Sequence, residues 1–300
     1  MASDHSDPTR LAPIGDVRRC LAGAFERLGL TVHDADALAE LLVDSELRGH
    51  PGHGVAALGI LAGFYGDGTL NPRPRVVGET EGALLLDGDR GCGPGAPTDA
   101  MQWCVERARE RKGMAVACVR DWQLLVCAPY ARIAAEAGLI GFACTNFVAL
   151  VAPPGGRTAV LGTNPFAYGL PAGRHQPVVL DVATTLSSMQ QVRVAADAGQ
   201  QLPDGVVFDR AGRPSSDPEA FFAGGLLAPL GSPHAPHKGF GVALFIDALS
   251  GVLSGAGFAK DVAGGRHVGE LSLGARCRGV PATAGVRGAN GLTDRPDQAG

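Results

Sequence analysis

Two histidines and an arginine stand close together in the glycine-rich stretch Arg48-Gly-His-Pro-Gly-His-Gly. An imidazole changes charge near neutral pH, so His50 and His53 suit acid–base chemistry or the binding of an anion. The Arg48 guanidinium fits a carboxylate with two parallel hydrogen bonds, and an ion pair with an acidic neighbour is its alternative role. A metal site would need further ligands, and only His234 and His237 form a comparable pair elsewhere, so we expect no metal.

Two further stretches carry polar side chains where ligands often bind. Leu161-Gly-Thr-Asn-Pro is a turn in which the hydroxyl of Thr163 and the amide of Asn164 are candidates to bind a small substrate, although the stretch by itself is explained equally by a plain turn. Leu180-Asp-Val-Ala-Thr-Thr brings the Asp181 carboxylate and two hydroxyls to the end of a strand, a common position for cofactor-binding loops. Capping of a following helix explains this second stretch equally well.

Two other phosphate-binding patterns do not match. The turn Gly91-Cys-Gly-Pro-Gly lies between an expected strand and an expected helix, but it lacks the spacing of the dinucleotide-binding fingerprint and carries a proline. We therefore expect a plain tight turn there. Lys238 is followed by glycine and not by the serine or threonine of a Walker A loop, which excludes classical P-loop chemistry.

Composition limits the remaining classes of protein. The chain has 300 residues, 45% apolar and 19% charged, which excludes a disordered chain and is enough to bury a substantial core. A formal charge of −4 without a basic block argues against nucleic-acid binding. No apolar run is long enough to span a membrane and the start lacks a secretory signal, so we expect a soluble cytoplasmic protein. The seven cysteines are scattered and are expected to be reduced thiols.

The spacing of apolar residues predicts a helical N-terminal region over residues 1–72. Helical periodicity runs over 14–47, with a break at Gly29 and a new start at Asp34, and a third helix is expected over 55–65. Residues 73–258 then alternate strands with helices, which predicts a mixed α/β sheet domain. The expected strands are 83–87, 114–119, 140–145, 159–161, 166–170 and 178–180, and the expected helices are 98–111, 129–137 and 239–253. Residues 259–300 lose this periodicity, and we expect them to be irregular and to contain no core strand.

Taken together, these stretches resemble the malate/L-lactate/ureidoglycolate dehydrogenase family, which includes sulfolactate dehydrogenases and cyclic imino-acid reductases. The matching stretches keep the family's order and spacing across about residues 15–258, and they are Leu47-Arg-Gly-His-Pro-Gly-His-Gly-Val, Leu86-Asp-Gly-Asp-Arg-Gly, Val151-Ala-Pro-Pro-Gly-Gly-Arg, Leu161-Gly-Thr-Asn-Pro, Leu180-Asp-Val-Ala-Thr and His237-Lys-Gly-Phe-Gly. The resemblance implies a sulfolactate dehydrogenase-like α/β fold, in which a helical N-terminal region accompanies a mixed-sheet cofactor domain that is not a Rossmann fold. It also implies a homodimer.

The resemblance further implies that NAD or NADP exchanges a hydride with a small 2-hydroxy acid of the malate or lactate type, or with a related imino acid. Such a reaction needs a cofactor over one face of the reacting carbon, a proton donor, and a cation on the carboxylate. By position in the matching stretches, Arg48 would hold the substrate carboxylate and His53 would be the acid or base. The residues that would contact the cofactor are Asp181, Ala183, Thr184, Lys238 and Gly239.

The sequence departs from the family around the reacting carbon and the cofactor. A second family histidine is replaced by Leu124, which cannot donate a proton. A small hydroxyl residue of the family is here Phe147, a Gly-Lys pair is here Gln190-Gln191, and a tryptophan before Gly-Gly is Pro154. The family's C-terminal Pro-Gly-Glu cofactor segment has no counterpart.

A shift of reading frame near Leu273 would account for the last of these departures. If the codons for residues 274–281 are read one nucleotide later, the genetic code permits Ala-Leu-Asp-Val-Glu-Ala-Phe, which is close to the family's strand and turn at that point. Neither shifted frame supplies a histidine codon at Leu124, so that loss is real or has a different origin.

Three functions remain open at the level of sequence. The first is an oxidoreductase that uses His53 as its proton donor. The second is a non-redox descendant, either a binding or regulatory protein or an inactive or truncated product, because the departures cluster at the cofactor. The third is a cofactor-free lyase or isomerase with His53 as its base. The identity of the substrate, the choice between NAD and NADP, and the direction of reaction are not specified by these residues.

Overall fold

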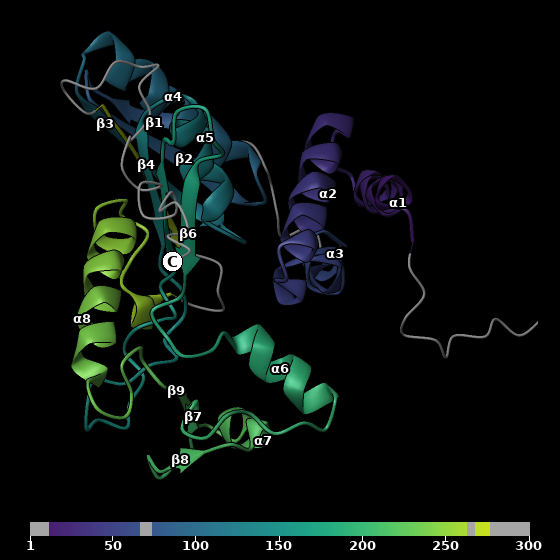
Figure 1. The fold of residues 1–300 in the computed structure, drawn as a ribbon, viewed down its shortest axis with the longest axis vertical. Helices are drawn as coiled ribbons and strands as arrows, with labels where there is room; N and C mark the ends of the chain where they lie inside the picture. The colour runs from purple at the N-terminus through teal and green to yellow at the C-terminus, as the bar shows by residue number, and fades with distance from the viewer. Residues whose placement is uncertain (1–11, 67–73, 263–267, 277–300) are drawn as a thin grey trace, which may run out of the picture. The chain divides into compact units, whose positions relative to one another are not determined.

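The computed structural model describes residues 12–66, 74–262 and 268–276. The chain forms two compact units, residues 1–69 and 70–300. The helices of the first unit are purple to dark blue in Figure 1, and those of the second run from blue through green. No helix in the described part of the chain is long and apolar enough to cross a bilayer.

The first unit is helical. It contains α1 Ile14–Arg27, α2 Val32–Leu47 and α3 Leu58–Gly66, with the single turns η1 Pro51–His53 and η2 Val55–Ala57 between α2 and α3. The chain reverses after α1 at Gly29, whose φ of 95° is easily adopted only by glycine. The hydroxyl of Thr31 then accepts a hydrogen bond from the Asp34 N–H (3.1 Å) and caps α2. The N-cap of α2 is therefore Thr31 and not the expected Asp34.

The second unit is built on a seven-stranded sheet with the strand order β1-β2-β3-β10-β4-β5-β6. The strands are β1 Arg75–Glu79, β2 Ala83–Cys92, β3 Met114–Gln123, β4 Ile140–Thr145, β5 Phe166–Leu170, β6 Val178–Val182 and β10 Gly269–Ala275. Strands β2 and β3 run parallel and are joined by the crossover helix α4 Gly95–Glu110, whereas their neighbours in the sheet pair antiparallel. The predicted mixed α/β sheet is confirmed.

Helices cover both faces of this sheet. On one face α4 and α5 Ala128–Glu136 bury a core of small apolar side chains around Trp122 and Tyr130. Side chains alternate between the faces of a strand, so Leu271 lies on the other face, where it packs with Ile246 of α8 Pro236–Asp247. Helix α8 continues into the π-helical turn η3 Ala248–Val252, so the single helix expected over 239–253 begins earlier and changes its hydrogen-bonding pattern near its end.

A smaller subdomain completes the second unit. Figure 1 shows it away from α4 and α5, at the other end of the unit. It holds α6 Met189–Asp197, α7 Pro218–Phe222 and a small antiparallel sheet of β7 Val207–Phe208, β8 Pro214–Ser215 and β9 Leu226–Leu227. The three strands were not expected, because each is only two residues long and leaves no periodicity to detect, and α7 is only five residues long. Helix α6 is the helix that follows Leu180-Asp-Val-Ala-Thr-Thr, which the sequence analysis raised only as an alternative. The strand expected at 159–161 is reduced to a single bridge between Val151 and Leu161.

The expectation that residues 259–300 contain no core strand is wrong. Strand β10 lies in the middle of the sheet, hydrogen-bonded to β3 on one side and β4 on the other. Its sequence, Gly-Glu-Leu-Ser-Leu-Gly-Ala, alternates polar or small residues with leucine and resembles a surface strand. Glu270 and Ser272 are nevertheless completely buried. Residues 277–300, including most of the segment affected by the expected frameshift, lie outside the described residues.

Candidate functional site

His53 ends the single turn η1, which follows the C-terminal end of α2. The His53 N–H donates to the carbonyl oxygen of His50 (2.9 Å), and the His50 N–H donates back to Ser45 of α2 (2.9 Å). The imidazole of His53 is half-buried. Burial, followed by the nearby His50, lowers the pKa of His53 below its ordinary value of 6.5. His53 is therefore neutral at pH 7 and able to accept a proton.

Glu46 holds the backbone that follows His53, a role that the sequence did not reveal. Its Oε2 accepts a hydrogen bond from the Val55 N–H (3.0 Å). The same oxygen would lie 2.2 Å from a Cβ at Gly54, so only glycine fits at that position without displacing Glu46. The only sequence signal for this contact was the glycine after His53.

Arg48 is exposed at the C-terminal end of α2. Its Nε donates to Oδ2 of Asp44 one turn earlier (2.8 Å). An exposed ion pair of this kind contributes at most about 1 kcal/mol to stability. The structure thus shows Arg48 in an ion pair with an acidic neighbour, which the sequence analysis gave as the alternative to binding a substrate carboxylate.

In the second unit, a chain of hydrogen bonds joins three of the expected site residues. The N–H and Oγ1 of Thr184 both donate to the carbonyl oxygen of Thr163 (2.9 and 2.8 Å). The Leu230 N–H donates to the Thr184 carbonyl (2.9 Å), and the Gly239 N–H donates to the Leu230 carbonyl (3.1 Å). We call Thr163, Thr184, Leu230 and Gly239 the loop frame, because they tie three loops that are distant in sequence to the first turn of α8.

Gly239 allows the closest approach in the loop frame. A Cβ at this position would lie 2.5 Å from both the nitrogen and the oxygen of Leu230, so any other residue would push the two segments apart. Lys238 immediately precedes it in the first turn of α8 and is exposed. Ala183, one residue before Thr184, is half-buried.

Asp181 and Asn164 have clear structural contacts. Oδ2 of Asp181 accepts hydrogen bonds from the N–H groups of Cys127 (3.0 Å) and Ala128 (2.7 Å), where α5 begins. It therefore caps the preceding helix α5, and not the following helix that the alternative for its stretch proposed, because the N-cap of α6 is Ser188. The fully buried Asn164 donates both amide hydrogens within the protein, to the carbonyl of Ala243 and to Oδ2 of Asp247 (2.9 Å each). These contacts fix Asn164 within the protein, and its expected contact with substrate stays a prediction.

A buried polar cluster behind the Gly-Thr-Asn-Pro turn also escaped the sequence analysis. The Asp247 carboxylate accepts from the side chains of Asn164 and Asn146, and Asn146 in turn accepts from the Gly269 N–H of β10 (2.8 Å). Burial raises the pKa of Asp247, and the hydrogen bonds from Asn164, Asn146 and the Ala259 N–H oppose that rise. The cluster fixes the turn that carries Thr163 against α8 and the middle of the sheet.

The residues that depart from the family also have defined places. Leu124 is only 9% exposed and belongs to the apolar core beneath α4 and α5. Gln191 forms a capping box with Ser188, each side chain bonding the other residue's N–H, and so starts α6. Phe147 is half-buried, and its N–H donates to Oδ1 of Asn164 (3.1 Å). Gln190 is half-buried in the first turn of α6.

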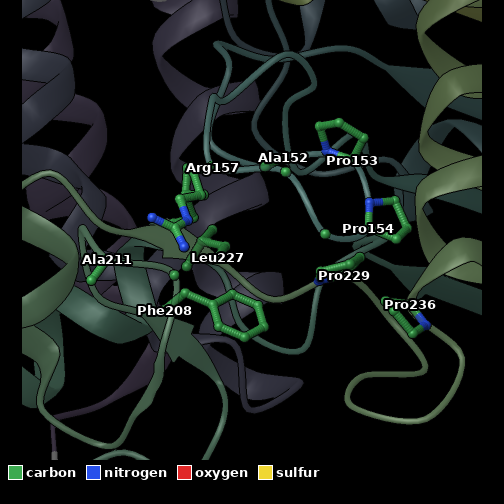
Figure 2. Close-up of a pocket in the computed structure, with 13 residues that line it drawn as sticks. Ala152, Pro153, Pro154, Arg157, Phe208, Ala211, Leu227, Pro229 and Pro236 are labelled. Atoms are coloured by element: carbon green, nitrogen blue, oxygen red, sulfur yellow. The ribbon is translucent and has the colours of Figure 1, made fainter.

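A pocket of about 220 Å³ borders the loop frame. Figure 2 shows it between the turn that carries Pro153 and Pro154, the side chains of Arg157 and Phe208, and the prolines Pro229 and Pro236. Pro229 directly precedes Leu230 of the loop frame, and Pro236 opens α8. Within the described ranges, no three His, Cys, Asp or Glu side chains are grouped so that they could hold a metal ion.

Comparison with known proteins gives consistent matches over most of the chain. A family model described as malate/L-lactate dehydrogenase matches residues 13–274. Malate dehydrogenase of Pyrococcus abyssi is 37% identical over 245 residues, which cover 79% of this chain and 66% of that enzyme, slightly less than two thirds of its length. The Δ1-pyrroline-2-carboxylate/Δ1-piperideine-2-carboxylate reductase of Pseudomonas putida is 31% identical over 86% of this chain and 75% of its own length.

Solved structures agree with these matches. The malate dehydrogenase of Pyrococcus horikoshii OT3 superposes with a TM-score of 0.80 at 30% identity, covering 90% of this chain and 77% of that one. Sulfolactate dehydrogenase of Methanocaldococcus jannaschii gives a TM-score of 0.78 at 27% identity, with coverage of 89% and 78%. The predicted resemblance and the predicted fold are both confirmed.

Proposed function

The chain belongs to the malate/L-lactate dehydrogenase family, and from this membership we propose that it is an oxidoreductase. The proposed reaction transfers a hydride between NAD or NADP and a small substrate. The substrate class is a 2-hydroxy acid of the malate or lactate type with its 2-oxo acid, or a related cyclic imino acid.

The loop frame is the observation that carries this proposal. It brings Thr163 and Thr184 from two loops together with Gly239 in the first turn of α8, and its backbone segments approach so closely that no side chain fits at Gly239. Close backbone approach next to a pocket of mixed polar and apolar lining suits a flat ring system and its phosphates. Bound there, a nicotinamide cofactor would supply or accept the hydride, with Ala183 and Thr184 beside it and the Lys238 ammonium available for its phosphates.

His53 is the proposed acid–base group. Because its pKa is lowered, the imidazole is neutral at pH 7 and accepts the hydroxyl proton when a 2-hydroxy acid is oxidised. In the opposite direction the protonated imidazole returns that proton to the 2-oxo acid. Glu46 keeps the His53 turn in place through the Val55 N–H.

Arg48 is the proposed partner of the substrate carboxylate. Arg48 and Asp44 form an exposed ion pair one helical turn apart. If Arg48 leaves Asp44 and pairs with a substrate carboxylate, little free energy is lost. The Arg48→Gln variant should therefore raise KM for the acid about tenfold or more and leave the Kd of the cofactor unchanged.

The second candidate is a non-redox protein that binds a small carboxylate. The third is a cofactor-free lyase or isomerase that uses His53 as its base. The burial of Leu124 favours them, because an apolar core residue stands where the family has its second histidine. Loss of one general acid or base lowers rates by about 10²–10⁴-fold, which leaves a slow oxidoreductase feasible.

Calorimetric titration of the purified, mass-verified protein with NADH and then NADPH, without substrate, separates these candidates. Micromolar binding followed by turnover of a 2-oxo or imino acid supports hydride transfer, and turnover should be lost in His53→Gln but kept in His33→Gln, an exposed histidine on α2. If the folded protein binds neither nucleotide up to millimolar concentration, hydride transfer is refuted. Product formed without cofactor identifies the lyase or isomerase.

We also propose, from the family resemblance, a cytoplasmic homodimer. Apolar side chains exposed along α8 and η3, including Val242, Phe245 and Val252, support an association surface. Light scattering coupled to size exclusion should give twice the chain mass of 30.6 kDa.

A further inference from the structure

A second imidazole, that of His50, lies one turn before His53. His50 directly precedes the single 3₁₀ turn η1, and the His53 N–H donates to the carbonyl oxygen of His50 (2.9 Å). A 3₁₀ turn completes one revolution in three residues, so the side chains of residues i and i+3 project from the same face. The backbone of this turn therefore puts the two imidazoles next to each other.

The charge of His50 acts on His53. Burial makes the largest contribution to the lowered pKa of His53, and the electrostatic effect of His50 lowers it further. Repulsion between two cations is appreciable only at short range in water, because the solvent and its ions screen it. The electrostatics thus agree with the backbone geometry in bringing the two rings together.

The two histidines differ in their access to solvent. His53 is half-buried and is followed by the buried Gly54, whereas His50 is exposed. A group that takes up a proton in every turnover must release it before the next one, and burial hinders its direct release to water. An imidazole accepts and donates protons near neutral pH, so an exposed imidazole beside a half-buried one is suited to carry the proton onward.

Backbone contacts on both sides hold this pair in place. Before the turn, the His50 N–H donates to the carbonyl oxygen of Ser45 in α2 (2.9 Å). After His53, the Val55 N–H donates to Oε2 of Glu46 (3.0 Å). Neither contact uses the His50 side chain, so the ring of His50 can be replaced without removing a bond that shapes the turn.

The charged side chains at this end of α2 are engaged in other contacts. Arg48 pairs with Asp44 (2.8 Å), and the Glu46 carboxylate accepts the N–H of Val55. Among the described residues, no carboxylate contributes to the shift of the His53 pKa. His50 is therefore the titratable group that acts on His53 in the described part of the first unit.

We propose that His50 relays protons between His53 and the solvent. This inference rests on the proposed acid–base role of His53 and deepens it, because it names the group through which the proton leaves. When a 2-hydroxy acid is oxidised, its hydroxyl proton passes to the His53 imidazole, then to the His50 imidazole and then to water, while the hydride goes to the oxidised cofactor. One proton is released for each hydroxyl oxidised, and both imidazoles return to the neutral form. Reduction of a 2-oxo acid uses the same path in reverse.

An NMR titration of the imidazole C–H signals in the full chain, without substrate or cofactor, tests the contact between the two rings. His50→Gln should raise the pKa of His53, because it removes the neighbouring positive charge. His33→Gln is the matched control, since it removes an exposed histidine of α2 and should leave the pKa of His53 unchanged. An unchanged pKa of His53 in His50→Gln overturns the relay, because the rings would then be too far apart to pass a proton.

The rate of oxidation of L-malate and of L-lactate with NAD or NADP, in dilute buffer at constant ionic strength, tests the transfer itself. His50→Gln should lower kcat about tenfold, which is less than the loss of a direct acid or base because water carries part of the flow. The KM of the acid and the Kd of the cofactor should stay unchanged, and added imidazole should restore kcat by accepting the proton from His53. His33→Gln should match the wild type. A kcat equal to that of the wild type in His50→Gln, or a loss that imidazole leaves in place, overturns the relay.

The outcomes separate the relay from the proposed function. If the wild type turns over and His53→Gln does not, normal kinetics of His50→Gln refute the relay alone. If the folded wild type oxidises neither acid and reduces neither 2-oxo acid, the proposed oxidoreductase fails. The titration needs no turnover, so a raised pKa of His53 in His50→Gln still supports the relay in that protein, and an unchanged one refutes it.

Discussion

Glu270 should make the second unit less stable as the pH rises. This carboxyl lies in the middle of β10 and is completely buried. Oε1 accepts a hydrogen bond from the Ser272 hydroxyl (2.6 Å), and Oε2 has no hydrogen-bond partner among the described residues. The titratable groups that face Glu270 from the neighbouring elements are thiols and one tyrosine hydroxyl, all of them neutral when protonated. They are Cys104 of α4, Cys118 of β3, Cys127 and Tyr130 at α5, and Cys144 of β4.

Burial raises the pKa of Glu270 from 4.5 to about 8, opposed only by the hydrogen bond from Ser272. Below pH 4.5 the carboxyl is protonated in both the folded and the unfolded chain, so it contributes no pH dependence. Between pH 4.5 and 8 the unfolded chain releases the proton and the folded chain keeps it. The free energy of unfolding therefore falls by about 1.4 kcal/mol per pH unit, on the order of 4 kcal/mol between pH 5 and pH 8.

The Glu270→Gln variant removes this ionisation and keeps an acceptor for Ser272. Urea unfolding at pH 5 and pH 8, followed by tryptophan fluorescence, measures the effect on the second unit, because Trp103 and Trp122 both belong to it. Relative to wild type, the variant should gain on the order of 4 kcal/mol between the two pH values. Any cost of burying the amide is the same at both pH values and cancels. Glu106→Gln, on the exposed side of α4, is the control, and parallel pH dependences of wild type and Glu270→Gln would refute the reasoning.

Three further predictions concern the site and the reading frame. Gly239→Ala should weaken binding of NADH or NADPH at least tenfold in calorimetry, because its Cβ would lie 2.5 Å from the Leu230 backbone, whereas Gly241→Ala, with open space at its Cβ, should bind normally. For oxidation of a 2-hydroxy acid, kcat/KM should fall with decreasing pH around a midpoint below 6.5, as His53 becomes protonated, and a midpoint above 7 would contradict its neutral state. Sequencing of the coding DNA should reveal a shifted frame encoding Ala-Leu-Asp-Val-Glu-Ala-Phe just after Leu273, and its absence there would remove the frameshift hypothesis.

The sequence predicted those elements in which a local pattern and the tertiary environment agree. The expected strands 140–145 and 166–170 coincide with β4 and β5, since both are short apolar runs bounded by turns. Strand β10 was missed because Glu270 and Ser272 are polar residues in a buried strand, an arrangement that depends on neighbours from β3, β4 and α4. The local pattern contradicted the position of the strand, and the position was decided by its partners.

The sequence identified several residues of the candidate site, but it did not predict the contacts that hold them together. Short motifs identified Thr163, Thr184 and Gly239, yet the hydrogen bonds that join them pass through Leu230, which belongs to no motif. The same limit applies to Glu46, whose role depends on the fold of the turn after His53. Motif matching detects the residues that a ligand would touch, whereas the residues that position them are identified only by contacts over long sequence separations.

The buried polar cluster shows how distant segments of the chain reach the proposed cofactor site. Gly269 of β10 donates to Asn146, and Asn146 and Asn164 both donate to Asp247 of α8. Asn164 adjoins Thr163 of the loop frame, so the central strand is connected to the frame through three consecutive side chains. A polar cluster that is completely buried holds its members in one arrangement, because breaking any one bond leaves a buried group unsatisfied. Asn146→Ala should accordingly weaken cofactor binding without touching the cofactor, and unchanged calorimetric affinity in a folded Asn146→Ala protein would show that the loop frame holds its shape independently of β10.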